Sequence, residues 1–251
     1  MRLKDKVAII TGANSGIGFA ATLRFSEEGA AIVAADVQES RQLTETIAAM
    51  GREATFVLTD VSVESEAQAL IDEAVKKYGH VDVLVNNAGI ELAKKVTDTT
   101  EQEWDRLMSV NLRGVFLCSK VAVIAMRQTG GGAIVNVASE LGLVGGKEIA
   151  AYCASKGGVI QLTKAMAIDH AADNIRINCV CPGPINTPLL NRIIGNSADP
   201  KKERRVIIEK TLMNRLGEPE EIAKVILFLS SDDSSYMTGS IVVADGGLTA
   251  Q

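Results

Sequence analysis

The stretch KVAIITGANSGIG (6–18) combines a short apolar run with a glycine-rich turn, and this combination decides the fold. The β-branched run predicts a strand, and the apolar spacing over residues 17–28 predicts a helix directly after it. Gly12, Gly16 and Gly18 therefore occupy the turn between the two. Glycines let the backbone approach a pyrophosphate, whose charge then faces the helix N-terminus. The stretch predicts a dinucleotide-binding turn, although glycine-rich turns also occur for packing reasons.

Six further runs of the same kind follow, and most of them are continuously apolar rather than alternating. The seven runs are KVAIIT (6–11), AAIVAAD (30–36), ATFVLTD (54–60), VDVLVNN (81–87), GGAIVNVAS (131–139), NIRINCVCPG (174–183) and GSIVVADGG (239–247). Continuous apolar runs are typical of strands buried on both faces of a parallel sheet that helices cover.

Segments with helical spacing lie between these runs. One covers residues 64–78, with acidic residues in its first turn and lysines in its last, and another begins at Pro219. Alternating strands and helices predict a doubly wound α/β fold. Because no linker or composition break divides the chain, we expect a single domain over residues 1–251. The least regular stretch, 186–215, fits either a solvated helix with loops or a variable lid over a substrate site.

Composition excludes several classes of protein. The 251 residues are 47% hydrophobic and 23% charged, which suits a globular core, and the net charge of −5 disfavours nucleic acid or an anionic membrane as partner. No apolar run approaches the roughly 18 residues of a membrane span, and the N-terminus does not resemble a signal peptide. We therefore expect a soluble, cytoplasmic protein.

The four cysteines do not indicate a metal site. They are Cys118, Cys153, Cys179 and Cys181, and no CxxC pair occurs among them. The two histidines are far from them in sequence, so we expect buried, reduced thiols and no bound metal.

Asp36 ends the second predicted strand, eighteen residues after Gly18. A carboxylate there can accept hydrogen bonds from both hydroxyls of an adenosine ribose and repels a 2′-phosphate. Neither Asn14 nor Ser15 supplies a positive charge to the turn, and Arg41 is the nearest base. The pattern favours NAD over NADP, unless Asp36 only caps the next helix.

Tyr152, Lys156 and Ser139 form the constellation that bears chemistry. Tyr152 and Lys156 lie one turn apart on a predicted helix over 150–168, and Ser139 ends a strand at the edge where such sheets bind ligands. Reduction of a ketone by hydride needs a proton donor, and a phenol whose pKa a nearby ammonium lowers can serve in both directions. A serine hydroxyl can stabilise the charge that develops on the same oxygen. The alternative is an exposed Tyr/Lys pair with a capping serine.

Nearly the whole chain resembles the short-chain dehydrogenase/reductase family of the single-domain type. The resemblance depends on motifs that occur in order and at suitable spacings: TGANSGIG (11–18), DV (60–61), NNAG (86–89), VNLRG (110–114), VNVAS (135–139), YCASK (152–156), PGPINT (182–187) and MTGSIVVADGG (237–247). The family implies a seven-stranded Rossmann sheet in the order 3-2-1-4-5-6-7 and a homotetramer.

The resemblance also implies roles for individual residues. Asn111 matches an asparagine of the proton relay in a distorted helix, Ser139 the substrate-orienting serine, Tyr152 the acid/base, and Lys156 the residue that binds the nicotinamide ribose. The implied cofactor contacts are Gly12, Asn14, Ser15, Gly16, Ile17, Gly18, Asp36, Asp60, Val61, Asn87, Ala88, Gly89, Tyr152, Lys156, Pro182, Gly183, Ile185 and Thr187.

Glu140 departs from the family pattern, which has a small residue after the serine. We expect its side chain to point to solvent, the alternative being that it faces the substrate and selects a cationic or hydroxyl-bearing group. The residues expected around the substrate are mostly apolar, namely Leu92, Ala93, Leu141, Val144, Ile149 and Leu189. They favour a carbon-rich substrate.

The sequence thus predicts an NAD-dependent oxidoreductase that interconverts a small secondary alcohol and its ketone. One alternative is an NADPH-dependent 3-oxoacyl-[acyl-carrier-protein] reductase, for which KKERR (201–205) would form a local basic patch despite the net negative charge. A hydroxysteroid or sugar dehydrogenase is also compatible. The alternative from another class is a non-catalytic dinucleotide sensor, which has no need of the complete tetrad.

Overall fold

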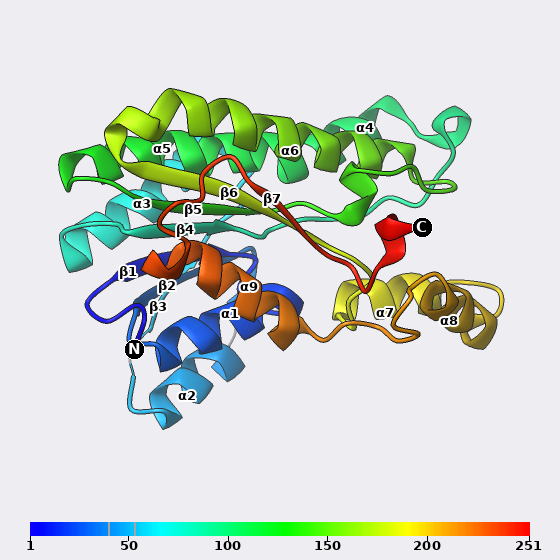
Figure 1. The fold of residues 1–251 in the computed structure, drawn as a ribbon, viewed down its shortest axis with the longest axis horizontal. Coiled ribbons are helices and arrows are strands. Elements are labelled where there is room, and N and C mark those ends of the chain that lie inside the picture. The colour runs from blue at the N-terminus through cyan, green and yellow to red at the C-terminus, as the bar shows by residue number, and fades with distance from the viewer. Residues whose placement is uncertain (40, 53) are drawn as a thin grey trace.

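The protein is built on one parallel sheet of seven strands in the order β3-β2-β1-β4-β5-β6-β7 (Figure 1). The computed structural model describes residues 1–39, 41–52 and 54–251. The strands are β1 (Val7–Thr11), β2 (Ala31–Asp36), β3 (Ala54–Leu58), β4 (Val83–Asn86), β5 (Gly132–Val137), β6 (Ile175–Pro182) and β7 (Ile241–Ala244). Each predicted run contains one of them, so the predicted doubly wound sheet and its strand order are confirmed.

Helices cover both faces of the sheet (Figure 1). One face carries α1 (Gly16–Glu27), α2 (Arg41–Ala49) and α9 (Pro219–Ser230), and the other carries α3 (Glu64–Tyr78), α4 (Glu101–Met108), α5 (Gly114–Gln128) and α6 (Ala150–His170). The predicted helix over 64–78 matches α3, and the helix expected from residue 150 is α6. Two further helices, α7 (Pro188–Gly195) and α8 (Pro200–Glu209), occupy the irregular stretch and project beyond the sheet.

The continuous apolar runs have a simple structural cause, which β1 illustrates. Ala8 and Ile10 point into the core beneath α1 and α9, whereas Val7 and Ile9 point into the core beneath α3 and α5. Successive side chains of a strand face opposite sides of the sheet, so a strand with a core on both sides needs apolar residues throughout.

All seven strands run in the same direction, so their carboxyl ends meet at one edge of the sheet. The strand order reverses between β1 and β4, where the chain crosses from one half of the sheet to the other. This is the place at which open α/β sheets bind ligands. The loops after β1, β4 and β5 therefore converge there.

The continuous helical segment Glu101–Gln128 has the length and mean hydropathy of a membrane span, but 61% of its apolar window is buried inside the protein. It consists of α4, a π-helical turn at Ser109–Arg113, and α5. A core helix of a globular fold has the same properties.

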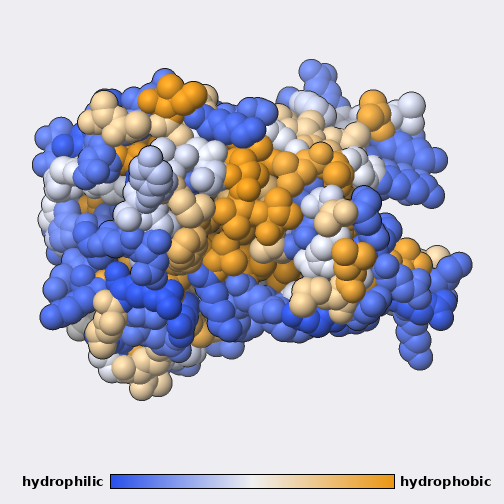
Figure 2. Space-filling model, in the orientation of Figure 1, coloured by the Kyte–Doolittle hydropathy of each residue, from blue (hydrophilic) through white to orange (hydrophobic). Residues whose placement is uncertain are grey.

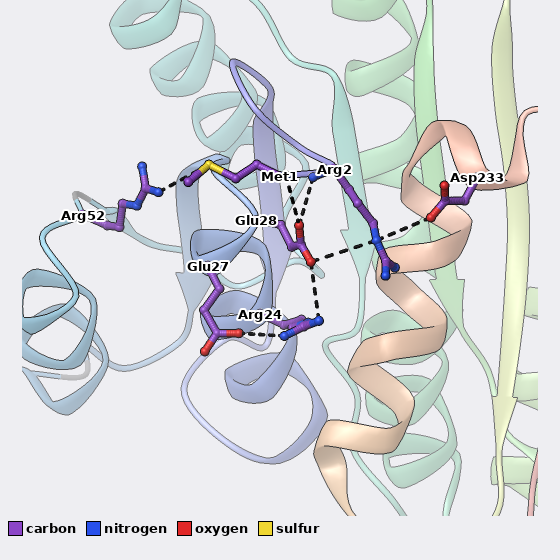
Figure 3. Close-up of polar contacts among 7 residues, drawn as sticks. All are labelled: Met1, Arg2, Arg24, Glu27, Glu28, Arg52 and Asp233. Atoms are coloured by element: carbon purple, nitrogen blue, oxygen red, sulfur yellow. Dashed lines mark hydrogen bonds and ion pairs between the residues drawn. The ribbon is translucent and has the colours of Figure 1, made fainter.

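Glu28 ties the N-terminus to the helical layer beneath the sheet (Figure 3). Its carboxylate accepts a hydrogen bond from the backbone N–H of Arg2 at 2.9 Å. The same carboxylate forms an ion pair with the Arg24 guanidinium at 3.4 Å. Arg2 also reaches Asp233 at 3.4 Å. The backbone hydrogen bond from Arg2 lowers the pKa of Glu28 most, and the Arg24 guanidinium lowers it further, while burial acts the other way.

We expect Glu28→Gln to lower the free energy of unfolding by about 1 kcal/mol at neutral pH, the size that solvent-screened ion pairs allow. Because folding lowers the pKa of Glu28, its contribution is complete above the unfolded pKa and disappears as the pH falls through the folded value. Urea unfolding at several pH values measures both effects. Glu27 is the control, because it is half exposed and, among the residues that the structure describes, forms an ion pair only with Arg24. Equal losses in Glu27→Gln and Glu28→Gln would contradict this account.

Candidate active site

A cavity of about 1110 Å³ opens at the carboxyl edge of the sheet. Its walls include the loops after β1 to β6, the first turns of α6, and the inner sides of α7 and α8. Figure 2 shows the molecule hollowed at its right-hand edge, between the lobe of α7 and α8 and the segments near α4. The cavity therefore lies where the strand order reverses.

The glycine-rich turn forms one end of this cavity. Gly12 and Gly16 have φ values of 65° and 55°, which glycine adopts without strain. Gly18 serves packing instead: a Cβ there would lie 2.0 Å from the carbonyl oxygen of Gly12. The turn therefore places bare backbone against the cavity, as a bound pyrophosphate requires.

Asp36 faces the same end of the cavity. Its carboxylate accepts hydrogen bonds from the backbone N–H groups of Val37 at 2.8 Å and Asn14 at 3.1 Å. It does not cap α2, which begins at Arg41. Among the described residues no cation lies within ion-pair distance of it, so its charge is free to act on a ligand in the cavity.

Hydrogen bonds fix the neighbouring loops. The Thr11 hydroxyl accepts from the backbone N–H groups of Asn87 and Ala88 at 3.0 and 3.1 Å, which joins the ends of β1 and β4. Asp60 accepts a hydrogen bond from the Ser62 hydroxyl at 2.6 Å and from Arg106 at 3.3 Å. Burial alone would raise the pKa of Asp60, but these hydrogen bonds lower it overall.

Asn111 lies in the π-helical turn between α4 and α5. Its side chain accepts from the backbone N–H of Ile90 at 2.8 Å and donates to the carbonyl of Ile90 at 2.8 Å and to Ser155 at 3.2 Å. The distorted helix that the family resemblance implies is present. The amide side chain clamps the loop after β4, where Gly89 and Ile90 line the cavity.

Tyr152 and Lys156 lie on the first turns of α6, with the Lys156 Nζ atom 5.6 Å from the centre of the Tyr152 ring. Lys156 is buried, and its amine donates to the carbonyl of Val137, at the end of β5, at 3.0 Å. Ser139 follows two residues later and is also buried, so three predicted side chains line one cavity.

The predicted lowering of the Tyr152 pKa is not what the structure shows. Burial raises the pKa of Tyr152, and the carboxylates of Glu91 and Glu140 raise it further, whereas a hydrogen bond from Ser139 opposes them. Burial also lowers the pKa of Lys156 to about 8. Burial therefore works against the charged form of both groups, although an amine with a pKa of about 8 still carries its proton at neutral pH.

Glu140 does not point to solvent as expected. It is buried, lines the cavity, and its Oε2 atom lies 2.5 Å from the Ser139 hydroxyl. The reason is local: Ser139 caps the 3₁₀ turn Glu140–Gly142, which packs against α6 and turns the Glu140 side chain inward. A Cβ on Gly142 would lie 2.8 Å from the backbone of Lys156.

Glu91, which is not among the residues predicted from the sequence, also lines the cavity. Burial raises its pKa to about 7, and the neighbouring Glu140 contributes. Its place directly after NNAGI, on a loop leaving a strand end, was the available signal. The expected apolar lining is present in part: Leu92 is not among the lining residues, and the carboxyl groups of Glu91 and Glu140 line the cavity beside the expected apolar side chains.

The cavity brings most of the remaining predicted residues together. Those that line it are Gly12, Ser15, Gly16, Ile17, Asp36, Asp60, Val61, Asn87, Ala88, Gly89, Ser139, Tyr152, Lys156, Pro182, Gly183, Ile185 and Thr187. Asn14, Gly18 and Asn111 lie behind the wall. Thr187 caps α7 by accepting from the N–H of Leu190 at 3.3 Å, and its methyl group contacts the glycine-rich turn near Gly16.

Within residues 1–39, 41–52 and 54–251, no group of three His, Cys, Asp or Glu side chains is placed to hold a metal ion. The four cysteines carry free thiols, and three of them are buried.

Comparison with known proteins identifies the family. Residues 12–249 match a family model described as enoyl-(acyl carrier protein) reductase. The chain is 42% identical to a 3-oxoacyl-[acyl-carrier-protein] reductase of Thermotoga maritima over 99% of both chains. It is also 42% identical to a meso-2,3-butanediol dehydrogenase of Serratia marcescens over 100% of this chain and 97% of the relative. A short-chain type dehydrogenase/reductase from Mycobacterium marinum has a similar structure, with a TM-score of 0.94, 35% identity, and coverage of 99% of this chain and 97% of that one.

The chain therefore belongs to the short-chain dehydrogenase/reductase family, whose members bind a nicotinamide dinucleotide. The site suits such a cofactor: the glycine-rich turn offers backbone to a pyrophosphate, and Asp36 offers acceptors to a ribose. The cavity continues from there to Tyr152, which leaves room for a substrate beyond the cofactor.

Proposed function

We propose that the protein is an NAD-dependent dehydrogenase that interconverts a small secondary alcohol and its ketone. The observation that carries this proposal is the placement of Tyr152, Lys156 and Ser139 on one wall of the cavity whose far end is the glycine-rich turn. That arrangement suits a proton transfer beside a hydride transfer. The butanediol dehydrogenase among the relatives acts on an alcohol, which supports the reaction class.

Each side chain has a distinct part in the proposed reaction. The cofactor, when bound, accepts or supplies the hydride. The Tyr152 hydroxyl gives its proton to the substrate oxygen in reduction and takes it back in oxidation, while Ser139 donates a hydrogen bond to the same oxygen. Lys156 binds the nicotinamide ribose and, when protonated, favours the phenolate of Tyr152. Asn111 holds the loop that closes this side of the cavity.

The acid/base role of Tyr152 predicts a large loss of kcat/KM in Tyr152→Phe. Removing a positioned proton donor costs about 10²- to 10⁴-fold in kcat/KM, because the developing oxyanion no longer receives a proton. Absorbance of the reduced cofactor, followed with a panel of alcohols and ketones, measures the loss. Cofactor binding is the control and should change little. Full activity of Tyr152→Phe would refute the acid/base role of Tyr152. A wild type with no activity on a broad panel of alcohols and ketones would favour a non-catalytic dinucleotide sensor.

NAD is the proposed cofactor because of Asp36. Its carboxylate can accept hydrogen bonds from two ribose hydroxyls and would repel a 2′-phosphate, and its position is fixed by backbone N–H groups. The loop around Asn14 and Ser15 adds no positive charge to compensate.

We expect NADH to bind at least about tenfold more tightly than NADPH, the ratio that one repulsion of about 1.4 kcal/mol produces. Fluorescence titration measures both dissociation constants. Asp36→Asn is the matched variant, because it keeps the shape of the side chain and removes its charge. In this variant the dissociation constants of NADH and NADPH should be more nearly equal. Tighter binding of NADPH by the wild type would overturn the assignment.

Reduction of 3-oxoacyl groups on acyl carrier protein is the second candidate. The Thermotoga maritima relative has this activity in its name. Basic side chains also gather beside the cavity: Lys201 and Lys202 are exposed on α8, and Arg192 and Lys210 line the cavity itself. An acidic carrier would fit this surface, but the carboxylate of Asp36, which would repel the 2′-phosphate of NADPH, favours the first candidate.

We further propose that residues 186–215 form a lid over the substrate within a single-domain chain. Both α7 and α8 contribute to the cavity wall, through Leu189, Ile193 and Val206 among others. These apolar side chains favour a carbon-rich substrate. The cytoplasmic location stays a prediction.

A homotetramer is proposed from two separate apolar surfaces. One is a shallow depression between α5 and α6, where Phe116 is 47% exposed. The other is the edge strand β7, whose Val243 is 42% exposed, and Figure 2 shows apolar residues across the middle of the face where β6 and β7 run. Two different self-complementary surfaces on one chain produce a closed tetramer.

Sedimentation velocity of the purified chain should give four times the mass of one chain. Phe116→Glu, which places a charge in the first surface, should give dimers that the second surface still holds together, because each surface forms its own twofold contact. A wild-type monomer at micromolar concentration would contradict the proposal.

A further inference from the structure

The Ser139 hydroxyl lies against the carboxyl group of Glu140, although both residues line the cavity. The Oγ atom of Ser139 lies 2.5 Å from Oε2 of Glu140, and it also accepts a hydrogen bond from the backbone N–H of Leu141 at 3.1 Å. A hydroxyl has one proton to donate and two lone pairs that accept. With one lone pair used by Leu141, the proton and the other lone pair remain, and Glu140, the Tyr152 hydroxyl and a ligand compete for them.

The protonation state of Glu140 decides whether Ser139 offers a ligand its hydroxyl proton or its second lone pair. An ionised Glu140 can only accept, so it takes the Ser139 proton, and Ser139 has nothing to donate to a substrate oxygen. A protonated Glu140 donates to the free lone pair of Ser139. The Ser139 proton then points away from Glu140, where the substrate oxygen must receive it.

We propose that Glu140 is a positioning residue that makes Ser139 a hydrogen-bond donor to the substrate oxygen only while Glu140 carries a proton. This inference rests on the proposed dehydrogenase function. It adds Glu140 to the residues of the proposed reaction, and it predicts that the reaction rate follows the ionisation of Glu140.

The surroundings of Glu140 favour the protonated form. Its side chain is 8% exposed, and among the described residues no cation lies within ion-pair distance of it. The groups that act on it electrostatically from other elements are Glu91 after β4, Asp245 after β7, Cys181 on β6 and Tyr152 on α6.

None of these groups is a base that carries positive charge. Lys156 on α6 directs its amine to the carbonyl of Val137. Burial raises the pKa of Glu140 most, Asp245 raises it further, and the hydrogen bonds from Ser139 and Leu141 oppose this. Glu140 therefore keeps its proton to a higher pH than an ordinary carboxyl group does, and it loses that proton as the pH rises further.

The test is the pH dependence of kcat/KM for ketone reduction with NADH. The wild type should lose activity by about tenfold per pH unit as Glu140 ionises, down to the level of Ser139→Ala, about 10²-fold below its maximum. Tyr152 does not cause this decline, because burial and the two carboxylates hold its proton to higher pH.

Glu140→Gln is the decisive variant. Its amide donates to Ser139 at every pH, so it should match the acidic wild-type rate within a few fold and show no decline. Glu140→Ala, which lacks the donor, should be slower and also flat. In a Ser139→Ala background, Glu140→Gln should change nothing. Glu91→Gln is the control for the neighbouring carboxyl: it should shift the decline without removing it. Thermal unfolding shows that each variant folds.

Three results would overturn the inference. They are a wild-type decline that persists in Glu140→Gln, a Glu140→Gln rate as low as that of Glu140→Ala at every pH, and an effect of Glu140→Gln that survives in Ser139→Ala. Infrared difference spectra of wild type against Glu140→Gln provide a readout without activity, namely a protonated-carboxyl band that disappears as the pH rises. If the wild type reduces no ketone, the proposed function fails, and the absence of this band near neutral pH would independently refute the protonated Glu140.

Discussion

The buried amine of Lys156 beside the Tyr152 ring is the constraint on which the site depends. A lysine with this little exposure loses hydration, which lowers its pKa to about 8, and its amine donates a hydrogen bond to the carbonyl of Val137. Burial likewise disfavours the phenolate of Tyr152. The protein therefore keeps two groups in conditions that oppose their charges. A ligand that brings polar groups into the cavity relieves this cost for both groups, and a ligand with positive charge relieves it for the phenolate.

The fold makes this arrangement possible. The end of β5 supplies both the Val137 carbonyl and Ser139, the 3₁₀ turn after it packs on α6, and α6 carries Tyr152 and Lys156 on adjacent turns. On the other side, Thr11 joins the ends of β1 and β4, and Asn111 clamps the loop that follows β4. Each of these contacts connects residues far apart in sequence at the carboxyl edge of the parallel sheet.

The sequence could predict what depends on pattern. Continuous apolar runs specified strands covered on both sides, and the glycine spacing located the turn where the cavity begins. It could not predict what depends on side-chain direction. Glu140 was expected in solvent because its residue type is polar, but the short turn after Ser139 directs it inward. Glu91 was missed because only the folded loop brings it near Tyr152, whose pKa is raised first by burial and further by Glu91 and Glu140.

The central claim is that one phenol moves the proton while an adjacent lysine holds the ribose of the cofactor. A crystal structure of the complex with NAD tests this most directly. The account predicts that the Lys156 amine lies within hydrogen-bond distance of the nicotinamide ribose and that the Tyr152 hydroxyl faces the reactive carbon of the ring. A complex with the phenol turned away from that carbon, and the amine still bound only to Val137, would contradict it.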